Sequence, residues 1–88
     1  MSKTTIDIKL PGYYIGICKE DKSKEQLIYF DSKNNDYYYG TYGIFGFHDV
    51  TLHKNYIRNL TDNEKQLLDN NKYIYLPQQF YQSIPVDF

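Results

Sequence analysis

The sequence predicts a small α+β protein: an antiparallel β-sheet or partly open barrel of five to six strands, with one short helix near residues 62–70. Apolar and polar residues alternate in several short segments, which is the pattern of half-buried strands. Clusters of Gly, Pro, Asn and Asp separate these segments and indicate turns. One segment in the C-terminal half instead carries a helix-capping motif.

The first two strands are predicted at residues 4–10 and 13–18. Both segments alternate in character, and β-branched and aromatic residues dominate the second, as strands favour. Pro11 and Gly12 end the first strand as a turn. The wholly polar run at residues 19–25 predicts a solvated loop that joins the second strand to the next one as a hairpin.

Three more strands are predicted in the middle of the chain. Residues 26–30 are mostly apolar, and residues 37–42 are rich in tyrosine. Between them, residues 31–36 predict a second hairpin turn, because Asn, Asp and Ser bond to their own backbone and tolerate left-handed conformations. Residues 47–53 alternate again and give the fifth strand.

The helix is predicted to begin at a capping box formed by Thr61 and Glu64. The Thr61 side chain can accept a hydrogen bond from the amide three residues on, and the Glu64 side chain can reach back. Its apolar face consists of Leu67 and Leu68. A helix that ends near Asn70 is too short to be stable alone, so it must dock on the sheet.

Two segments follow the helix. Residues 73–76 predict a sixth strand, closed by Pro77. Residues 78–88 alternate around Pro85, which excludes a central strand, so we expect a docked tail.

Length and composition favour one cytoplasmic domain that spans residues 1–88. No apolar run approaches the roughly 20 residues needed to cross a bilayer, and the N-terminus carries no apolar signal-peptide core. We therefore expect no membrane partner. The net charge of −1, with acidic and basic residues interleaved, disfavours both DNA binding and DNA mimicry.

No pattern predicts a catalytic site, a metal or a cofactor. Cys18 is the only cysteine, and with His48 or His53 it would form a nucleophile and base, but a lone cysteine at a strand end is more often a small buried hydrophobe. Strand alternation places His48 on the face opposite Asp49 and His53, so these groups cannot converge on a metal. Residues 31–36 lack the spacing of a calcium loop, and the glycines form no phosphate-binding loop.

Tyrosine is the strongest signal, at 11 of the 88 residues. If Phe30 pairs with Tyr37 across the turn, these two and Tyr39 lie on the core face. The opposite, wetter face then carries the predicted partner-binding residues Tyr29, Asp31, Asp36, Tyr38 and Tyr42. Exposed tyrosines bury a large area at small entropy cost and concentrate at interfaces. The alternative is that codon bias produced them, because the chain has no alanine and favours residues with A/T-rich codons, and that they serve only as cross-strand pairs.

We expect a small non-enzymatic protein that binds another protein. Small size and A/T-rich codon usage favour an accessory protein of a phage or mobile element that inhibits a host or defence protein. Association of the chain with itself stays open. One alternative is a single-stranded nucleic-acid or nucleotide binder that stacks bases on surface tyrosines and gathers lysines around them. The other is an enzyme that uses Cys18 and a histidine.

Overall fold

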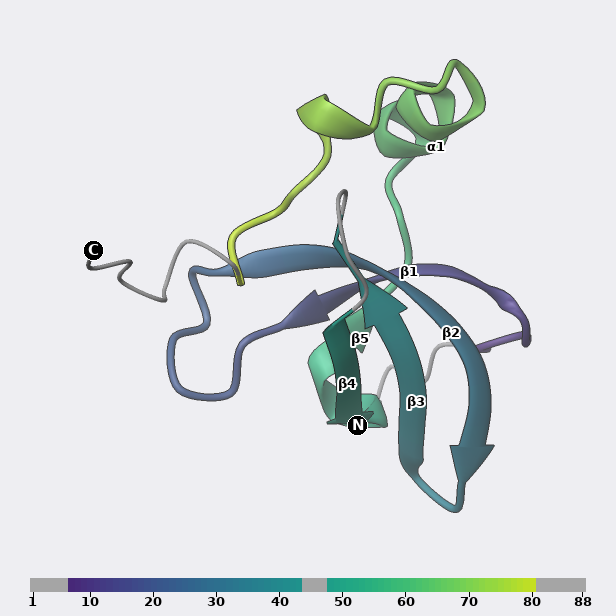
Figure 1. The fold of residues 1–88 in the computed structure, drawn as a ribbon, viewed down its shortest axis with the longest axis vertical. Helices are drawn as coiled ribbons and strands as arrows, with labels where there is room; N and C mark the ends of the chain where they lie inside the picture. Colours follow the sequence, from purple (N-terminus) through teal and green to yellow (C-terminus); the bar gives the residue numbers. More distant parts are fainter. Residues whose placement is uncertain (1–6, 44–47, 81–88) are drawn as a thin grey trace, which may run out of the picture.

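The computed structural model describes residues 7–43 and 48–80, which form one antiparallel sheet and one short α-helix (Figure 1). The strands lie in the order β4-β3-β2-β1-β5. Their bounds are β1 (Gly12–Ile17), β2 (Glu25–Asn34), β3 (Tyr37–Tyr42), β4 (His48–His53) and β5 (Ile57–Arg58). The helix is α1 (Asp62–Asp69), and the 3₁₀ turns are η1 (Lys54–Tyr56) and η2 (Tyr73–Tyr75). The predicted α+β class, with an open five-stranded sheet and one short helix, is confirmed.

Two predicted strands are not formed in the described residues. Residues 7–10 lie outside the sheet, and the remainder of that predicted strand falls outside the described residues. Residues 73–76 form η2 and its cap, because the Leu76 N–H donates to the Tyr73 carbonyl at 3.0 Å. Leu76 is buried beside the helix, whereas the three residues before it are exposed. The predicted sixth strand is therefore wrong, and residues 81–88 of the predicted tail lie outside the described part.

The turn between β2 and β3 is shorter than predicted. β2 continues through most of residues 31–36 and ends at Asn34. The turn itself consists of Asn35 and Asp36. Asn35 has a φ of 60°, a left-handed conformation that Asn adopts more readily than most residues.

A β-bulge at Asp31 sets the register of this hairpin. The regular pairing of the two strands shifts between Phe30 and the residue after Asp31, which leaves Asp31 without a direct partner. Phe30 therefore pairs with Gly40, and the predicted pairing of Phe30 with Tyr37 is wrong. Because a shift of one residue exchanges the two faces of a strand, Tyr38 now shares the buried face with Phe30.

The sheet carries one hydrophobic cluster on each face. The larger cluster has as its buried members Ile28, Phe30, Tyr38 and Ile57. The smaller cluster has as its buried members Ile15, Leu27, Leu60 and Leu76. Leu27 and Ile28 are consecutive, so strand alternation sends one into each cluster and makes β2 a member of both.

A glycine allows the sheet to coil around the larger cluster. β1 and β4 are not neighbours in the sheet. Nevertheless, a Cβ atom at Gly16 of β1 would lie 2.6 Å from Cδ1 of Leu52 on β4. The two strands approach each other across the concave side, as in a strongly twisted sheet.

α1 begins at the predicted capping box. The Glu64 N–H donates to Oγ1 of Thr61 at 3.1 Å, and the Thr61 N–H donates to Oε1 of Glu64 at 2.9 Å. Leu67 and Leu68 pack against the smaller cluster, so the helix covers one end of that face (Figure 1). Among residues 7–43 and 48–80, no helix combines the length and the apolarity that a membrane span requires.

Residues 77–79 lie beside the first half of β2, where β3 does not pair with it. The Leu27 N–H donates to the Pro77 carbonyl at 2.8 Å. The Gln79 N–H donates to the Glu25 carbonyl at 2.9 Å. The open edge of β2 is thereby covered by the chain itself.

Candidate functional site

One face of the sheet carries exposed tyrosines beyond the end of the helix. Tyr13 of β1 pairs with Tyr29 of β2, and Tyr29 pairs with Thr41 of β3. Because alternate residues of a strand share a face, Tyr37 and Tyr39 lie on the same side. With one further tyrosine from η2, they form the tyrosine face, defined as Tyr13, Tyr29, Tyr37, Tyr39 and Tyr73.

The length of α1 explains why these tyrosines stay exposed. Along β1 and β2, this side of the sheet passes from Ile15 and Leu27 to Tyr13 and Tyr29. The first pair is buried in the smaller cluster with the helix, whereas the second pair is exposed. α1 has 8 residues, about two turns, and packs over Ile15 and Leu27 but not over Tyr13 and Tyr29.

A cavity of about 350 Å³ lies between η2 and the sheet. Its lining includes Tyr13, Tyr29 and Tyr73, together with the polar side chains of Thr41 and Gln78. No charged side chain is among the described residues that line it. Its volume lies at the lower end of the range of roughly 300–1,000 Å³ that is typical of ligand pockets.

The phenol groups of the cavity influence one another. The ring centroids of Tyr13 and Tyr29 are 4.9 Å apart, with the ring planes tilted by 55°. Partial burial raises the pKa of Tyr13, and the neighbouring Tyr73 and Tyr29 phenols raise it further because phenolates close together would repel. The Tyr13 hydroxyl therefore remains protonated at neutral pH and can donate a hydrogen bond.

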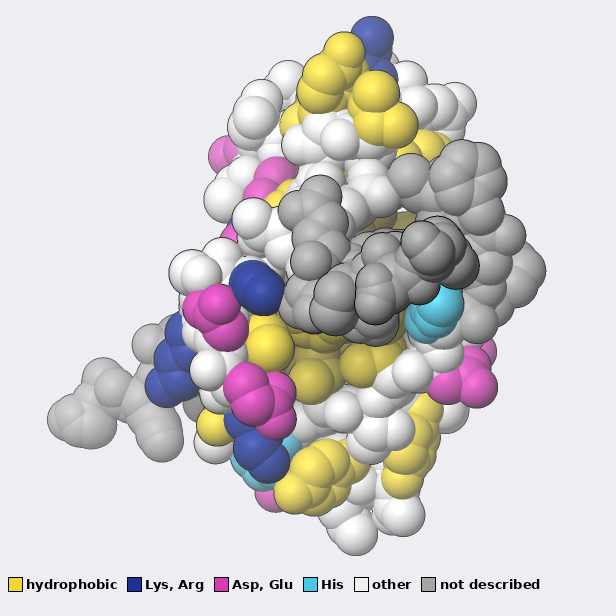
Figure 2. All heavy atoms as spheres, turned by 60° about the vertical axis from the view of Figure 1, so that its left-hand side comes forward, with side chains coloured by type: hydrophobic (Ala, Val, Ile, Leu, Met, Phe, Trp, Pro, Cys, Tyr) yellow, Lys and Arg dark blue, Asp and Glu magenta, His cyan; other side chains and the backbone are white. Residues whose placement is uncertain are grey.

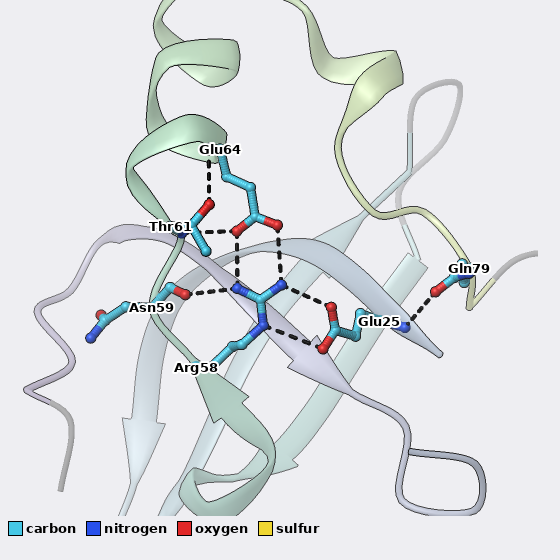
Figure 3. Close-up of polar contacts among 6 residues, drawn as sticks. All are labelled: Glu25, Arg58, Asn59, Thr61, Glu64 and Gln79. Atoms are coloured by element: carbon cyan, nitrogen blue, oxygen red, sulfur yellow. Dashed lines mark hydrogen bonds and ion pairs between the residues drawn. The ribbon is translucent and has the colours of Figure 1, made fainter. Parts of the chain in front are cut away.

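Arg58 ties β5 to β2 and to α1 beside the tyrosine face (Figure 3). Its guanidinium donates to Glu25 at 2.8 and 3.3 Å, to Glu64 at 2.9 and 3.1 Å, and to the Asn59 carbonyl at 3.0 Å. Hydrogen bonds from Arg58 lower the pKa of Glu64, and the two carboxylates raise the pKa of Arg58. The donors of this guanidinium are thus directed at acceptors of the protein, and the network fixes the helix on the sheet.

The structure brings only part of the predicted partner-binding set to the tyrosine face. Tyr29 lies on it and is exposed. Tyr38 is 7% exposed and packs edge-on against Phe30, with 6.2 Å between ring centroids. Tyr42 is half-buried against the same larger cluster, although it also contributes to the cavity wall. The prediction that Tyr38 and Tyr42 lie on the wetter face is therefore wrong, because the bulge shifts the register.

The two predicted carboxylates belong to the turn end of the β2–β3 hairpin. Asp31 occupies the bulge and is exposed. Asp36 is also exposed, and its side chain lies 3.5 Å from Nζ of Lys54 and 4.0 Å from Nε2 of His53. Neither carboxylate lines the cavity.

Sequence reasoning missed four members of the tyrosine face. The predicted pairing assigned Tyr37 and Tyr39 to the core, whereas they are 50% and 36% exposed. Tyr73 lies in η2, whereas the sequence predicted a strand at residues 73–76. For Tyr13, the alternation showed that it shares a face with Ile15, but only the pairing with β2 shows where helix cover ends.

The groups considered for catalysis have structural contacts. The thiol of Cys18 donates to Oε1 of Glu20 across 3.6 Å. Nδ1 of His53 accepts a hydrogen bond from the Asn55 N–H at 3.1 Å. In the part of the chain that the structure describes, no group of three or more His, Cys, Asp and Glu side chains is placed to hold a metal ion.

Charged side chains are interleaved by sign at the surface. Figure 2 shows Lys, Asp and Glu side chains mixed along one side, while hydrophobic side chains gather in a central hollow and at the upper end. Lys33 reaches over the ring of Tyr38, 5.8 Å from its centroid, on the side opposite the tyrosine face. Lys54 forms an ion pair with Asp36, with 3.5 Å between Nζ and Oδ1. Lys33, one of the lysines that a nucleic-acid site could use, therefore does not lie on the tyrosine face.

Comparison of the chain with the models of known protein families, with curated proteins and with solved structures finds no match.

Proposed function

We propose that this chain is a small non-enzymatic protein-binding module and that the tyrosine face contacts the partner. The observation that carries the proposal is the set of five exposed tyrosines on one side of the sheet. A tyrosine combines a large apolar ring with a hydroxyl and has few rotatable bonds. It therefore gives contact area and a hydrogen bond at small entropy cost, which is why tyrosine is enriched at interfaces.

The residues between these tyrosines support the proposal. On β3, the positions on this side are Tyr37, Tyr39 and Thr41, and the neighbouring positions on β2 and β1 are Tyr29 and Tyr13. These five positions carry no charge, and the centre of a protein interface is likewise depleted of Lys, Glu and Asp. Codon bias can account for the number of tyrosines, but it does not account for five exposed tyrosines on one side of the sheet. On β4, Asp49 pairs with Thr41 and lies on the same side, so it marks one border of the uncharged stretch.

A finer role rests on composition and size. We propose that the partner is a host or defence protein that this chain inhibits, and that the chain is an accessory protein of a phage or mobile element. A/T-rich codon usage and the length of 88 residues support this role.

The test is a quantitative pull-down from a low-GC bacterial lysate, treated with nuclease so that nucleic acid cannot bridge proteins. The tagged wild type is compared with Tyr29→Ser/Tyr39→Ser and with the control Ile74→Ser/Tyr75→Ser. The control removes hydrophobic side chains that are 69% and 66% exposed but lie outside the tyrosine face. Circular dichroism verifies that all three are folded.

We expect a stoichiometric partner with the wild type and the control, and its loss with the tyrosine-face variant. Truncation of an interface tyrosine commonly costs about 2 kcal/mol or more, a reduction in affinity of roughly 30-fold. Equal capture of the same protein by all three would show that another surface binds it. Loss only with the control would assign binding to η2.

A further inference from the structure

Residues 49–53 of β4 present an edge of the sheet that no described residue covers. At the opposite end, β5 has only 2 residues, and the free part of β2 is covered by residues 77–79. β4 has 6 residues and contains no proline, lysine or bulge. Proteins use prolines, lysines and bulges to keep exposed sheet edges from pairing with other chains, and β4 lacks all three.

We propose that this edge binds β4 of a second copy of this chain, antiparallel about a two-fold axis at Thr51. In this register Thr51 lies opposite Thr51 of the second copy. Asp49 then lies opposite His53 of the second copy, and Val50 lies opposite Leu52 of the second copy. Each contact occurs twice, as two-fold symmetry requires.

Side-chain complementarity selects this register. Val50 and Leu52 pack against the larger cluster, so their pairing continues the apolar side of the sheet across the axis. Asp49 and His53 lie on the other side and place an acid opposite a base, and opposed threonines are a favourable pair. An axis at Leu52 would instead place Val50 opposite Lys54. An axis between two residues would join the apolar side of one copy to the polar side of the other.

This pairing closes at two copies. Each chain offers one long open edge among its described residues, and the contact uses that edge in both copies. The other end of the sheet stops at the short β5, so a third copy finds no equivalent edge. The contact is therefore isologous and does not lead to a filament.

Sedimentation equilibrium of the full chain tests the proposal with Thr51→Lys and Thr51→Glu, each alone and mixed in equal amounts. Thr51 is exposed, so both substitutions should leave the monomer folded. In a homodimer each variant places like charges opposite each other at the axis, whereas the mixture places lysine opposite glutamate. The matched control is Ser32→Lys and Ser32→Glu, an exposed residue on β2 away from the β4 edge.

We expect a wild-type dimer, association at least about tenfold weaker for each Thr51 variant alone, and a heterodimer in the mixture. The Ser32 variants should associate like the wild type. A wild type that stays monomeric up to about millimolar concentration, where even a weak dimer would form, would overturn the proposal. So would a dimer insensitive to Thr51, or one that the mixture does not restore. The proposed function rests on the five tyrosines and not on the edge of β4, so failure of the pairing leaves it untouched, although Thr51 and His53 neighbour Tyr39 and Tyr37 across the β3–β4 ladder.

Discussion

Tyr38 is the tyrosine of β3 that is buried in the larger cluster, where its ring packs against Phe30. Its neighbours Tyr37 and Tyr39 lie on the other side of the strand and are exposed. Three consecutive side chains of the same kind therefore have two different roles. Strand alternation separates them, and the bulge decides which of them is buried.

Replacing Tyr38 with Ala should lower the free energy of unfolding by about 3 kcal/mol, because it leaves a cavity against Phe30. Tyr39→Ala should cost less than about 1 kcal/mol, since exposed substitutions have small effects. Urea denaturation of both variants measures the difference. A larger loss for Tyr39 than for Tyr38 would mean that β3 presents its faces the other way.

Arg58 is the residue through which the sheet holds the helix. Arg58→Met should destabilise the protein by roughly 2 kcal/mol at neutral pH, because it removes charged hydrogen bonds and leaves Glu25 and Glu64 without a counter-charge. The stability of Arg58→Lys should lie between that of Arg58→Met and that of the wild type, since one ammonium cannot bind both carboxylates bidentately. Urea denaturation at pH 7 measures both.

The same network predicts a pH dependence. The pKa of Glu64 in the folded protein is lowered below its usual 4.5 by the hydrogen bonds from Arg58. The stability this confers is complete above the unfolded-state pKa and is lost as pH falls through the folded-state pKa. The difference in unfolding free energy between wild type and Arg58→Met should therefore shrink as pH falls below about 4.5. A difference that is constant down to about pH 2 would contradict this assignment.

At the scale of elements, α1 depends on its capping box. Thr61→Ala should cost about 1 kcal/mol, because the Glu64 N–H loses its acceptor. Thr61→Ser keeps the hydroxyl and should have little effect. Chemical denaturation checks both variants, and an unchanged midpoint with an unchanged m-value for Thr61→Ala would show that the cap contributes nothing.

The contact between β2 and β3 depends on Gly40. A Cβ atom there would meet backbone atoms, including the Tyr29 carbonyl and, at 2.9 Å, Cα of Phe30. At Gly16 the closest atoms are instead the ends of the Ile28 and Leu52 side chains, which can move. Gly40→Ala should therefore cost about 2 kcal/mol or more, and clearly more than Gly16→Ala. Thermal unfolding of the two variants compares them, and equal losses would refute the distinction.

The sequence predicts those elements that short-range signals determine. The bounds of β3 and the cap at Thr61 follow from residues within a few positions of each other. The bulge at Asp31 has no comparable signal, because residues 31–36 contain turn-forming residues throughout and only the pairing with β3 shows where the strand ends. The tyrosine face depends on that pairing, so Tyr29 alone was placed on it correctly. η2 was missed because the burial of Leu76 against α1 is a long-range contact.

At the scale of the whole molecule, the two clusters differ in how they are built. The larger cluster lies within the curve of the sheet and draws on several strands. The smaller cluster joins α1 and Leu76 to β1 and β2 through a few leucines and one isoleucine. Arg58 adds a polar connection between the same parts.

Because α1 and η2 join the sheet through the smaller cluster, which is separate from the larger one, we expect them to open as a local unit while the sheet stays intact. Such an opening would expose Ile15 and Leu27, which lie next to Tyr13 and Tyr29 on the same side of β1 and β2. Amide hydrogen exchange should therefore be faster in α1 than in the interior of β2, and Arg58→Met should accelerate it in α1 alone. A partner that binds the extended surface would select the open form, and its affinity would then include the free energy of that opening.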